Sequence, residues 1–165
     1  SFERRNYKKP TIFQTKMKEY EVLRKKYSLP NLKELEQDFG FEEIEEQKYL
    51  LRAIVKKIID TIETHAKLLE EIINPEASIS NMNEASSFNE EEKPLILKNY
   101  KKLLFYHRSH MQINLNYDEK SFADFLNTFY EDWHKIKVDL NTIIGKRKNS
   151  WKKDVKTKIE LGYFG

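Results

Sequence analysis

Large apolar side chains recur every three or four residues between residues 122 and 143, and this spacing strongly restricts how the segment can fold. The repeating positions are Phe122, Phe125, Leu126, Phe129, Trp133, Ile136, Leu140 and Ile143. Because an α-helix has about 3.6 residues per turn, these side chains share one helical face. The pattern predicts an amphipathic helix over about 118–144, ended by Gly145.

Two earlier segments show the same kind of repeat. In residues 42–73, Ile44, Leu51, Ile54, Ile58, His65, Leu68 and Ile72 fall on heptad-like positions, with Val55, Ile62 and Leu69 beside them. In residues 89–113, Leu97, Tyr100, Leu104, His107 and Met111 form one line, with Ile96 and Leu103 next to it. Asn74 and Pro75 should end the first segment, and Ser87 or Asn89 can cap the second. Both segments predict long helices.

The N-terminal part predicts two shorter helices. From Thr11 onward, Phe13, Met17, Tyr20, Leu23 and Tyr27 follow helical spacing, and Pro30 should lie beyond the end of this helix. Asn31 can cap a second helix over 31–40, in which Gly40 occupies the position of a left-handed C-terminal cap. The segment between Asn74 and the next long helix is rich in Asn, Ser and Glu, so we expect it to be a surface loop.

The predicted fold class is therefore all-α. Only four Gly and four Pro occur in 165 residues, which favours long helices over the many turns of a β-sandwich. We expect a bundle in which the helices over about 42–73, 89–113 and 118–144 form an antiparallel core, with the shorter N-terminal helices laid across it. The length suits a single domain over residues 1–165.

Missing residue types and motifs argue against several functions. The chain has no Cys, which excludes disulfide frameworks and thiolate chemistry. From this we expect an intracellular, cytoplasmic setting, since that compartment is reducing. Apolar runs are too short for a membrane span. Neither a glycine-rich phosphate loop nor a GxSxG or HExxH motif is present. We therefore expect neither catalysis nor a bound cofactor.

Four histidines are the remaining candidates for chemistry. His107 and His110 are three residues apart, as are Glu131 and His134, and such pairs lie on one helical face. A site of His65, Glu131 and His134 is possible in a bundle, but a core histidine with a hydrogen-bonded neighbour is the commoner arrangement. We predict no metal site, and a structural pairing of His107 or His110 with Asp124.

Both ends of the chain are basic. Residues 1–10 form a basic arm with four Lys or Arg and one Glu, and residues 145–165 form a basic extension. The candidate binding residues are Lys146, Arg147, Lys148, Trp151, Lys152, Lys153, Lys156 and Lys158. They can contact nucleic-acid phosphates, with Trp151 stacking on a base. Alternatively, Trp151, Val155 and Ile159 form the apolar face of a C-terminal helix, and the lysines are its solvated side.

Two aromatic clusters allow a similar choice. Phe105, Tyr106 and His107 can offer stacking surfaces, and Phe129, Tyr130 and Trp133 can line a pocket, but aromatic stripes on periodic helices usually form core. With no catalytic set in view, the sequence favours a non-catalytic helical protein–protein interaction module or a subunit of a larger assembly. The alternative is a nucleic-acid-associated protein that uses its basic terminal segments.

Overall fold

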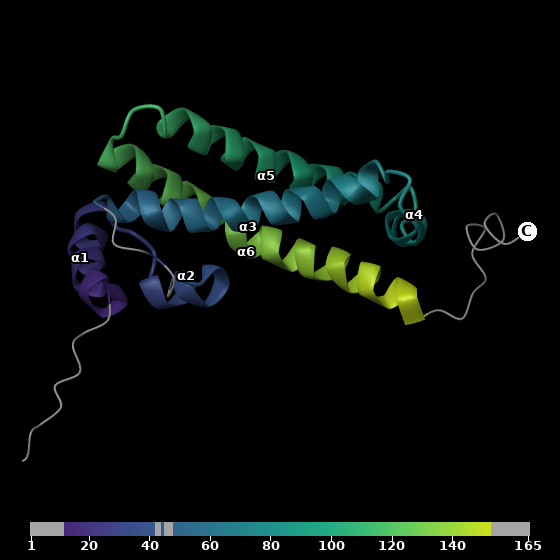
Figure 1. The fold of residues 1–165 in the computed structure, drawn as a ribbon, viewed down its shortest axis with the longest axis horizontal. Coiled ribbons are helices and arrows are strands. Elements are labelled where there is room, and N and C mark those ends of the chain that lie inside the picture. The colour runs from purple at the N-terminus through teal and green to yellow at the C-terminus, as the bar shows by residue number, and fades with distance from the viewer. Residues whose placement is uncertain (1–11, 42–43, 45–47, 153–165) are drawn as a thin grey trace, which may run out of the picture.

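The protein is a bundle of helices in which three long ones form the centre (Figure 1). The computed structural model describes residues 12–41, 44 and 48–152, and within these residues every regular element is helical. The long helices are α3 (Leu50–Ile73), α5 (Lys93–Ile113) and α6 (Glu119–Asn149). Helix α3 packs against α5 and α6, and α5 runs antiparallel to both. The predicted all-α bundle is confirmed.

Helix α6 buries the stripe that its sequence predicts. All eight apolar positions of that stripe, from Phe122 to Ile143, are buried. Asp118 caps the helix, and its carboxylate accepts the backbone N–H of Ser121 at 3.2 Å. On α3, the buried line runs through Val55, Ile58, Ile62, Leu69 and Ile72. Since one buried large aliphatic or aromatic side chain contributes about 1.5–3 kcal/mol, these two faces supply much of the core.

The short helices α1 (Ile12–Tyr27) and α2 (Leu32–Phe39) lie at the end of the bundle where α5 turns into α6 (Figure 1). As predicted, the Asn31 side chain caps α2 and accepts the backbone N–H of Lys33 at 2.8 Å. Gly40 ends the helix with a φ of 65°, a backbone conformation that favours glycine. The cap turns the chain back toward α3 and places Phe41 in the core.

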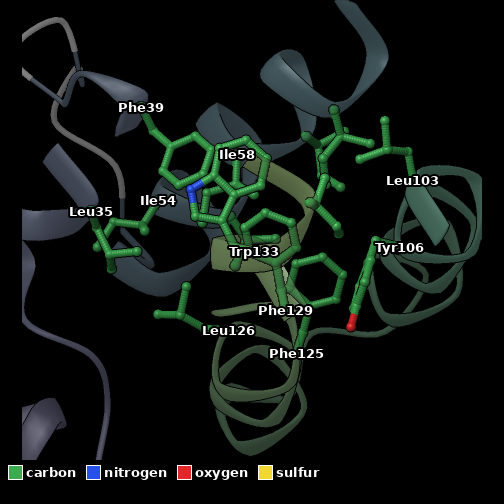
Figure 2. Packing of buried hydrophobic residues seen from close by; sticks show 14 of the residues in the cluster. Leu35, Phe39, Ile54, Ile58, Leu103, Tyr106, Phe125, Leu126, Phe129 and Trp133 are labelled. Carbon is green, nitrogen blue, oxygen red and sulfur yellow. The ribbon is translucent and has the colours of Figure 1, made fainter. Parts of the chain in front are cut away.

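Aromatic rings join α2 to α6 in the centre of the core (Figure 2). Phe39 lies against Trp133 and Phe129, with ring centroids 5.1 and 5.8 Å apart, respectively. The Trp133 Nε1–H donates to the Asp38 carboxylate at 2.9 Å, so the indole is buried without losing its polar partner. Phe129 and Trp133 are thus core residues rather than the lining of a pocket.

The structure differs from the sequence prediction at three boundaries. Helix α3 begins at Leu50 rather than near residue 42. The connection after it is not all loop, because Ser78 caps a further helix, α4 (Ile79–Ser86), by accepting the Asn81 backbone N–H at 3.4 Å. Gly145 does not end α6, which continues to Asn149 and passes into a short 3-10 helix, η1 (Ser150–Lys152). The predicted end of α6 was wrong because a single glycine is tolerated inside a well-packed helix.

Helix α5 is rotated about its axis relative to the prediction. Its buried residues are Ile96, Asn99, Leu103 and Tyr106, whereas Leu97 and Met111, from the predicted line, are 41% and 54% exposed. Asn99 is buried because its amide donates to the Asp139 carboxylate at 3.0 Å and to the Leu95 carbonyl at 2.9 Å. A satisfied polar group can occupy a core position, and apolar counting alone does not identify it.

Candidate interaction surface

The basic segment that follows residue 145 is divided by the fold into an inner and an outer part. Lys146 and Arg147 belong to the last turns of α6, and both bind carboxylates elsewhere in the chain. Lys148, Trp151 and Lys152 are exposed. Lys153, Lys156 and Lys158 lie outside the described residues, as do the predicted C-terminal helix beyond Lys152 and the basic arm of residues 1–10.

Arg147 lies inside the fold and connects three helices. Its Nε and Nη2 groups donate to both oxygens of Glu84 on α4, at 2.9 and 3.2 Å. Nη2 also donates to Glu71 at 3.1 Å, and Nη1 donates to the Leu68 carbonyl at 2.7 Å, both on α3. The side chain is only 9% exposed. This planar, two-pronged pairing suits Arg and cannot be reproduced by Lys.

The charge of Arg147 is stabilised where it lies. Burial by itself lowers the pKa of the guanidinium, but the hydrogen bonds to Glu84 and Glu71 more than offset that effect, and the net shift of the pKa is upward. Since a buried charge needs a hydrogen-bonded counter-charge, the two glutamates account for an arginine in this position. We conclude that Arg147 attaches α4 to the bundle.

Lys146 connects the end of α6 to the start of α5. Its ammonium binds the Glu92 carboxylate and lies 5.3 Å from the centroid of the Phe88 ring. Glu92 also exchanges two hydrogen bonds with Asn89, one from each backbone N–H to the other side chain, at 3.0 and 3.2 Å. This is the reciprocal arrangement of a capping box, but it closes the turn before α5, which begins at Lys93 with Glu92 in the N-cap position. The prediction that Ser87 or Asn89 caps this helix was therefore wrong.

An apolar groove opens where α3, α4 and α5 meet. It has a volume of about 450 Å³. The lining residues are Ile72, Ile73, Pro75, Ala85, Glu90, Lys93, Pro94 and Leu97. Two of these lining residues, Ile73 and Leu97, have 43% and 41% of their surface exposed. Its volume lies within the range of about 300–1,000 Å³ that is usual for binding pockets.

His107 binds a different carboxylate from the one predicted. Its Nε2 lies 2.6 Å from Glu63 on α3, and the Arg108 Nη1 lies 2.6 Å from its Nδ1. Because a guanidinium can only donate, Nδ1 must accept, and the proton of the neutral ring is on Nε2 and points at Glu63. The structural pairing that we expected is present, but with Glu63 in place of Asp124.

The other histidines do not form a common site. The His65 Nδ1–H donates to the Thr61 carbonyl at 2.8 Å, within its own helix. His134 is exposed and lies edge-on to the Tyr130 ring, with centroids 4.7 Å apart. Across residues 12–41, 44 and 48–152, no three His, Asp or Glu side chains are grouped closely enough to hold a metal ion. His65, Glu131 and His134 therefore do not converge.

The aromatic pair on α5 is divided between core and surface. Tyr106 is buried, where its hydroxyl donates to the Asp132 carboxylate and burial, followed by that hydrogen bond, raises its pKa. The Phe105 ring lies edge-on to that of Tyr106, with centroids 5.4 Å apart, and is 62% exposed. Of Phe105, Tyr106 and His107, which we considered for stacking, Phe105 is the exposed one.

No helix in the described part of the chain is both long and apolar enough to cross a membrane. Comparison with protein-family models, with curated proteins and with solved structures gave no match to this chain. The fold and the surface of the molecule are therefore the grounds on which its function is proposed.

Proposed function

We propose that this protein is a non-catalytic helical interaction module, and that the groove between α3, α4 and α5 receives an apolar segment of a protein partner. The observation that supports this proposal most directly is the pair of large aliphatic side chains, Ile73 and Leu97, exposed beside the groove. Buried Ile72 contributes to its lining, so an entering side chain meets apolar surface. Apolar surface rimmed by polar residues is typical of protein-binding sites.

The rim of the groove suits a protein segment with a polar outer side. Glu90 and Lys93 line the groove and form an ion pair with each other, so the rim carries both charges but no net charge. A partner with an apolar anchor and polar flanks fits this arrangement, because the anchor is desolvated while the flanks stay in water. Helix α4 adds Ala85 to the wall, which links the shape of the groove to the ion pairs of Arg147.

The proposal is tested by affinity capture from extract of the protein's own cells, with and without nuclease. The bait is the full chain, either unchanged or carrying Ile73→Asp together with Leu97→Asp. Both side chains are about two-fifths exposed, so the fold should survive their replacement. We expect a protein to be captured by the unchanged chain, to remain after nuclease treatment and to be lost from the double variant.

A matched control separates binding in the groove from nonspecific binding. Val138 on α6 is 65% exposed, and Val138→Asp makes a similar change away from the groove. The control should capture the same protein as the unchanged chain. Equal loss in Val138→Asp and in the groove variant, or release of the captured protein by nuclease, would refute the proposal.

A further inference from the structure

Helix α5 differs from its neighbours in charge. Its 21 residues contain five Lys or Arg and no Asp or Glu. Its two long partners are mixed: α3 carries four acidic residues and α6 carries five. A helix with one sign of charge and no compensating carboxylate of its own creates a positive potential over its exposed side.

The cations of α5 gather on the side that faces away from the core. We define the α5 basic face as Lys98, Lys101, Lys102, Phe105 and Arg108, whose spacing of three and four residues places them on one side of the helix. Buried Asn99, Leu103 and Tyr106 lie on the opposite side. From Lys98 to Arg108 the face extends about 15 Å, at 1.5 Å per residue. Phe105 therefore stands between cations on either side.

The fold neutralises these cations only in part, although Asp139 lies near Lys98 and the pocket beside Arg108 includes Glu63 and Glu70. Lys102 lies 4.0 Å from Asp132, at the limit of an ion pair. Within the described residues, no carboxylate forms an ion pair with Lys98, Lys101 or Arg108. By contrast, Lys146 and Arg147 are both paired internally. Positive charge that a fold leaves uncompensated is available to an external anion.

Helix α6 adds a cation to the same face. Exposed Lys135 lies next to Lys98, and the proximity of Lys135, followed by that of Lys102, lowers the pKa of the Lys98 ammonium. Like charges held together across two helices repel one another, and a bound anion relieves this repulsion. The α5 basic face thus has an electrostatic reason to bind a polyanion.

The central aromatic side chain selects among polyanions. Phe105 is the exposed apolar member of the face, and its neighbours Lys101, Lys102 and Arg108 are charged. An acidic amphipathic helix or a membrane surface needs an apolar stripe, which one ring does not provide. A duplex hides its bases and would leave the ring unused. A single strand offers both phosphates and unstacked bases, and this combination of cations with an exposed aromatic is how proteins bind single strands.

We propose that the α5 basic face binds single-stranded nucleic acid, with Phe105 stacking on a base and the flanking cations contacting phosphates. This site is separate from the groove assigned above to a protein partner, since Leu97, not Phe105, lines that groove. It is also separate from the basic terminal segments. The two proposals can therefore succeed or fail independently.

The test measures fluorescence anisotropy of a labelled 12-nucleotide oligo(dT) titrated with the full chain. Four phosphate contacts on a single strand predict a salt slope near −2.8, so binding should weaken about fifty-fold between 50 and 200 mM salt. Phe105→Ala should weaken binding about ten-fold without changing the salt slope, because stacking is not ionic. Lys101→Glu with Lys102→Glu should weaken binding more and make the slope shallower.

Controls separate the face from the rest of the basic surface. Lys33 on α2 is exposed, and Lys33→Glu makes the same kind of charge change on a helix that packs against α3 rather than α5. Lys153→Glu, Lys156→Glu and Lys158→Glu together test the terminal segment. The proposal fails if oligo(dT) does not bind at 50 mM salt, or if either control weakens binding as much as the α5 variants.

Two further probes identify a different class of partner. A labelled 12-base-pair duplex that binds as tightly as oligo(dT), and equally with or without Phe105, would overturn single-strand binding in favour of a purely ionic contact. Poly-glutamate that displaces oligo(dT) at equal charge concentration would point instead to an acidic protein. Circular dichroism of each variant checks that the helices are intact, so that lost binding is assigned to the surface.

Discussion

Helices α2 and α4 are both eight residues long and lie at opposite ends of the bundle, but they are attached in different ways. Helix α2 buries Leu32, Leu35 and Phe39, whereas α4 buries no residue fully. The hold on α4 includes the bidentate pairing of Glu84 with Arg147. Apolar burial stabilises α2 at any pH, whereas an ion pair that replaces hydration gives a smaller net gain and depends on both partners.

This difference teaches that one part of the molecule can loosen without unfolding the other. The α2 end shares its aromatic core with α6, so its loss affects the whole bundle. The α4 end depends on a few charged side chains at the tips of α3 and α6. Because α4 also forms one wall of the groove, its attachment bears on the proposed partner site.

Removing an apolar contact between α2 and α6 should have the largest effect on stability. Phe39→Ala removes the ring that lies against Phe129 and Trp133, and it should cost about 3–4 kcal/mol of the free energy of unfolding. Urea denaturation followed by tryptophan fluorescence measures this loss. Val138→Ala, an exposed control, should change stability by less than about 0.5 kcal/mol. A loss below about 1 kcal/mol for Phe39→Ala would contradict the account of the α2 end.

Removing the ion pairs of Arg147 should lower the free energy of unfolding by less, and its effect should be confined to the region around α4. Arg147→Met leaves Glu84 and Glu71 without their donor, and we expect a loss of about 2–3 kcal/mol. Hydrogen exchange should show α4 amides losing protection while those of α3 keep it. Arg147→Lys should have a stability between that of Arg147→Met and that of the unchanged chain, because Lys keeps the charge without the bidentate geometry. Unchanged protection of α4 in Arg147→Met would show that other contacts hold it.

Replacing Gly40 or Gly145 by Ala should change the stability of the protein in opposite directions. Gly40 has a positive φ, so Gly40→Ala should destabilise the cap of α2 by about 1 kcal/mol. Gly145 lies inside α6 and an added Cβ meets nothing within 4 Å, so Gly145→Ala should stabilise by about 0.5–1 kcal/mol. Thermal denaturation of the two variants gives the comparison. The same sign for both would contradict either the positive φ of Gly40 or the position of Gly145 inside α6.

The smallest expected effect is the pH dependence of stability that His110 on α5 causes. Burial, followed by the proximity of His107, lowers the pKa of His110 below its ordinary value of 6.5. The unfolded chain therefore binds this proton more readily, and the stability that neutral His110 contributes is present above pH 6.5 and lost as pH falls through the lowered pKa. Unfolding at pH 7 and pH 5 should show a smaller difference in His110→Gln than in the unchanged chain. An identical difference would assign the pH dependence to other groups.

The long helices could be predicted from the sequence because their apolar spacing is redundant. In α6, eight positions agree on one face, and no single residue decides the outcome. In α5, apolar residues occur almost all round the helix, including Leu97, Leu103, Leu104 and Phe105. Several faces then fit nearly as well, and only contact with α3 and α6 selects the one that is buried. The exposure of Phe105 follows from that selection.

The burial of Arg147 could have been predicted from its helical spacing, although the basic composition around it suggests the opposite. It lies four residues after Ile143 and seven after Leu140, so it continues the buried stripe of α6. Within a run of Lys and Arg, charge suggests a solvated surface, and the spacing points to the core. The spacing was the better guide, but Glu71 and Glu84 come from distant parts of the chain, and the sequence does not indicate that they meet Arg147.

The sequence by itself determined the fold class, the three long helices and the cap residues Asn31 and Gly40, because periodicity and capping are local properties of the chain. Tertiary structure decided which face of α5 is buried, that Arg147 binds two carboxylates inside the fold, and that Phe105 is exposed among the cations of α5. These outcomes depend on which side chains meet across helices. The free energy of burying a charge or a ring is set by those partners rather than by its neighbours in the chain.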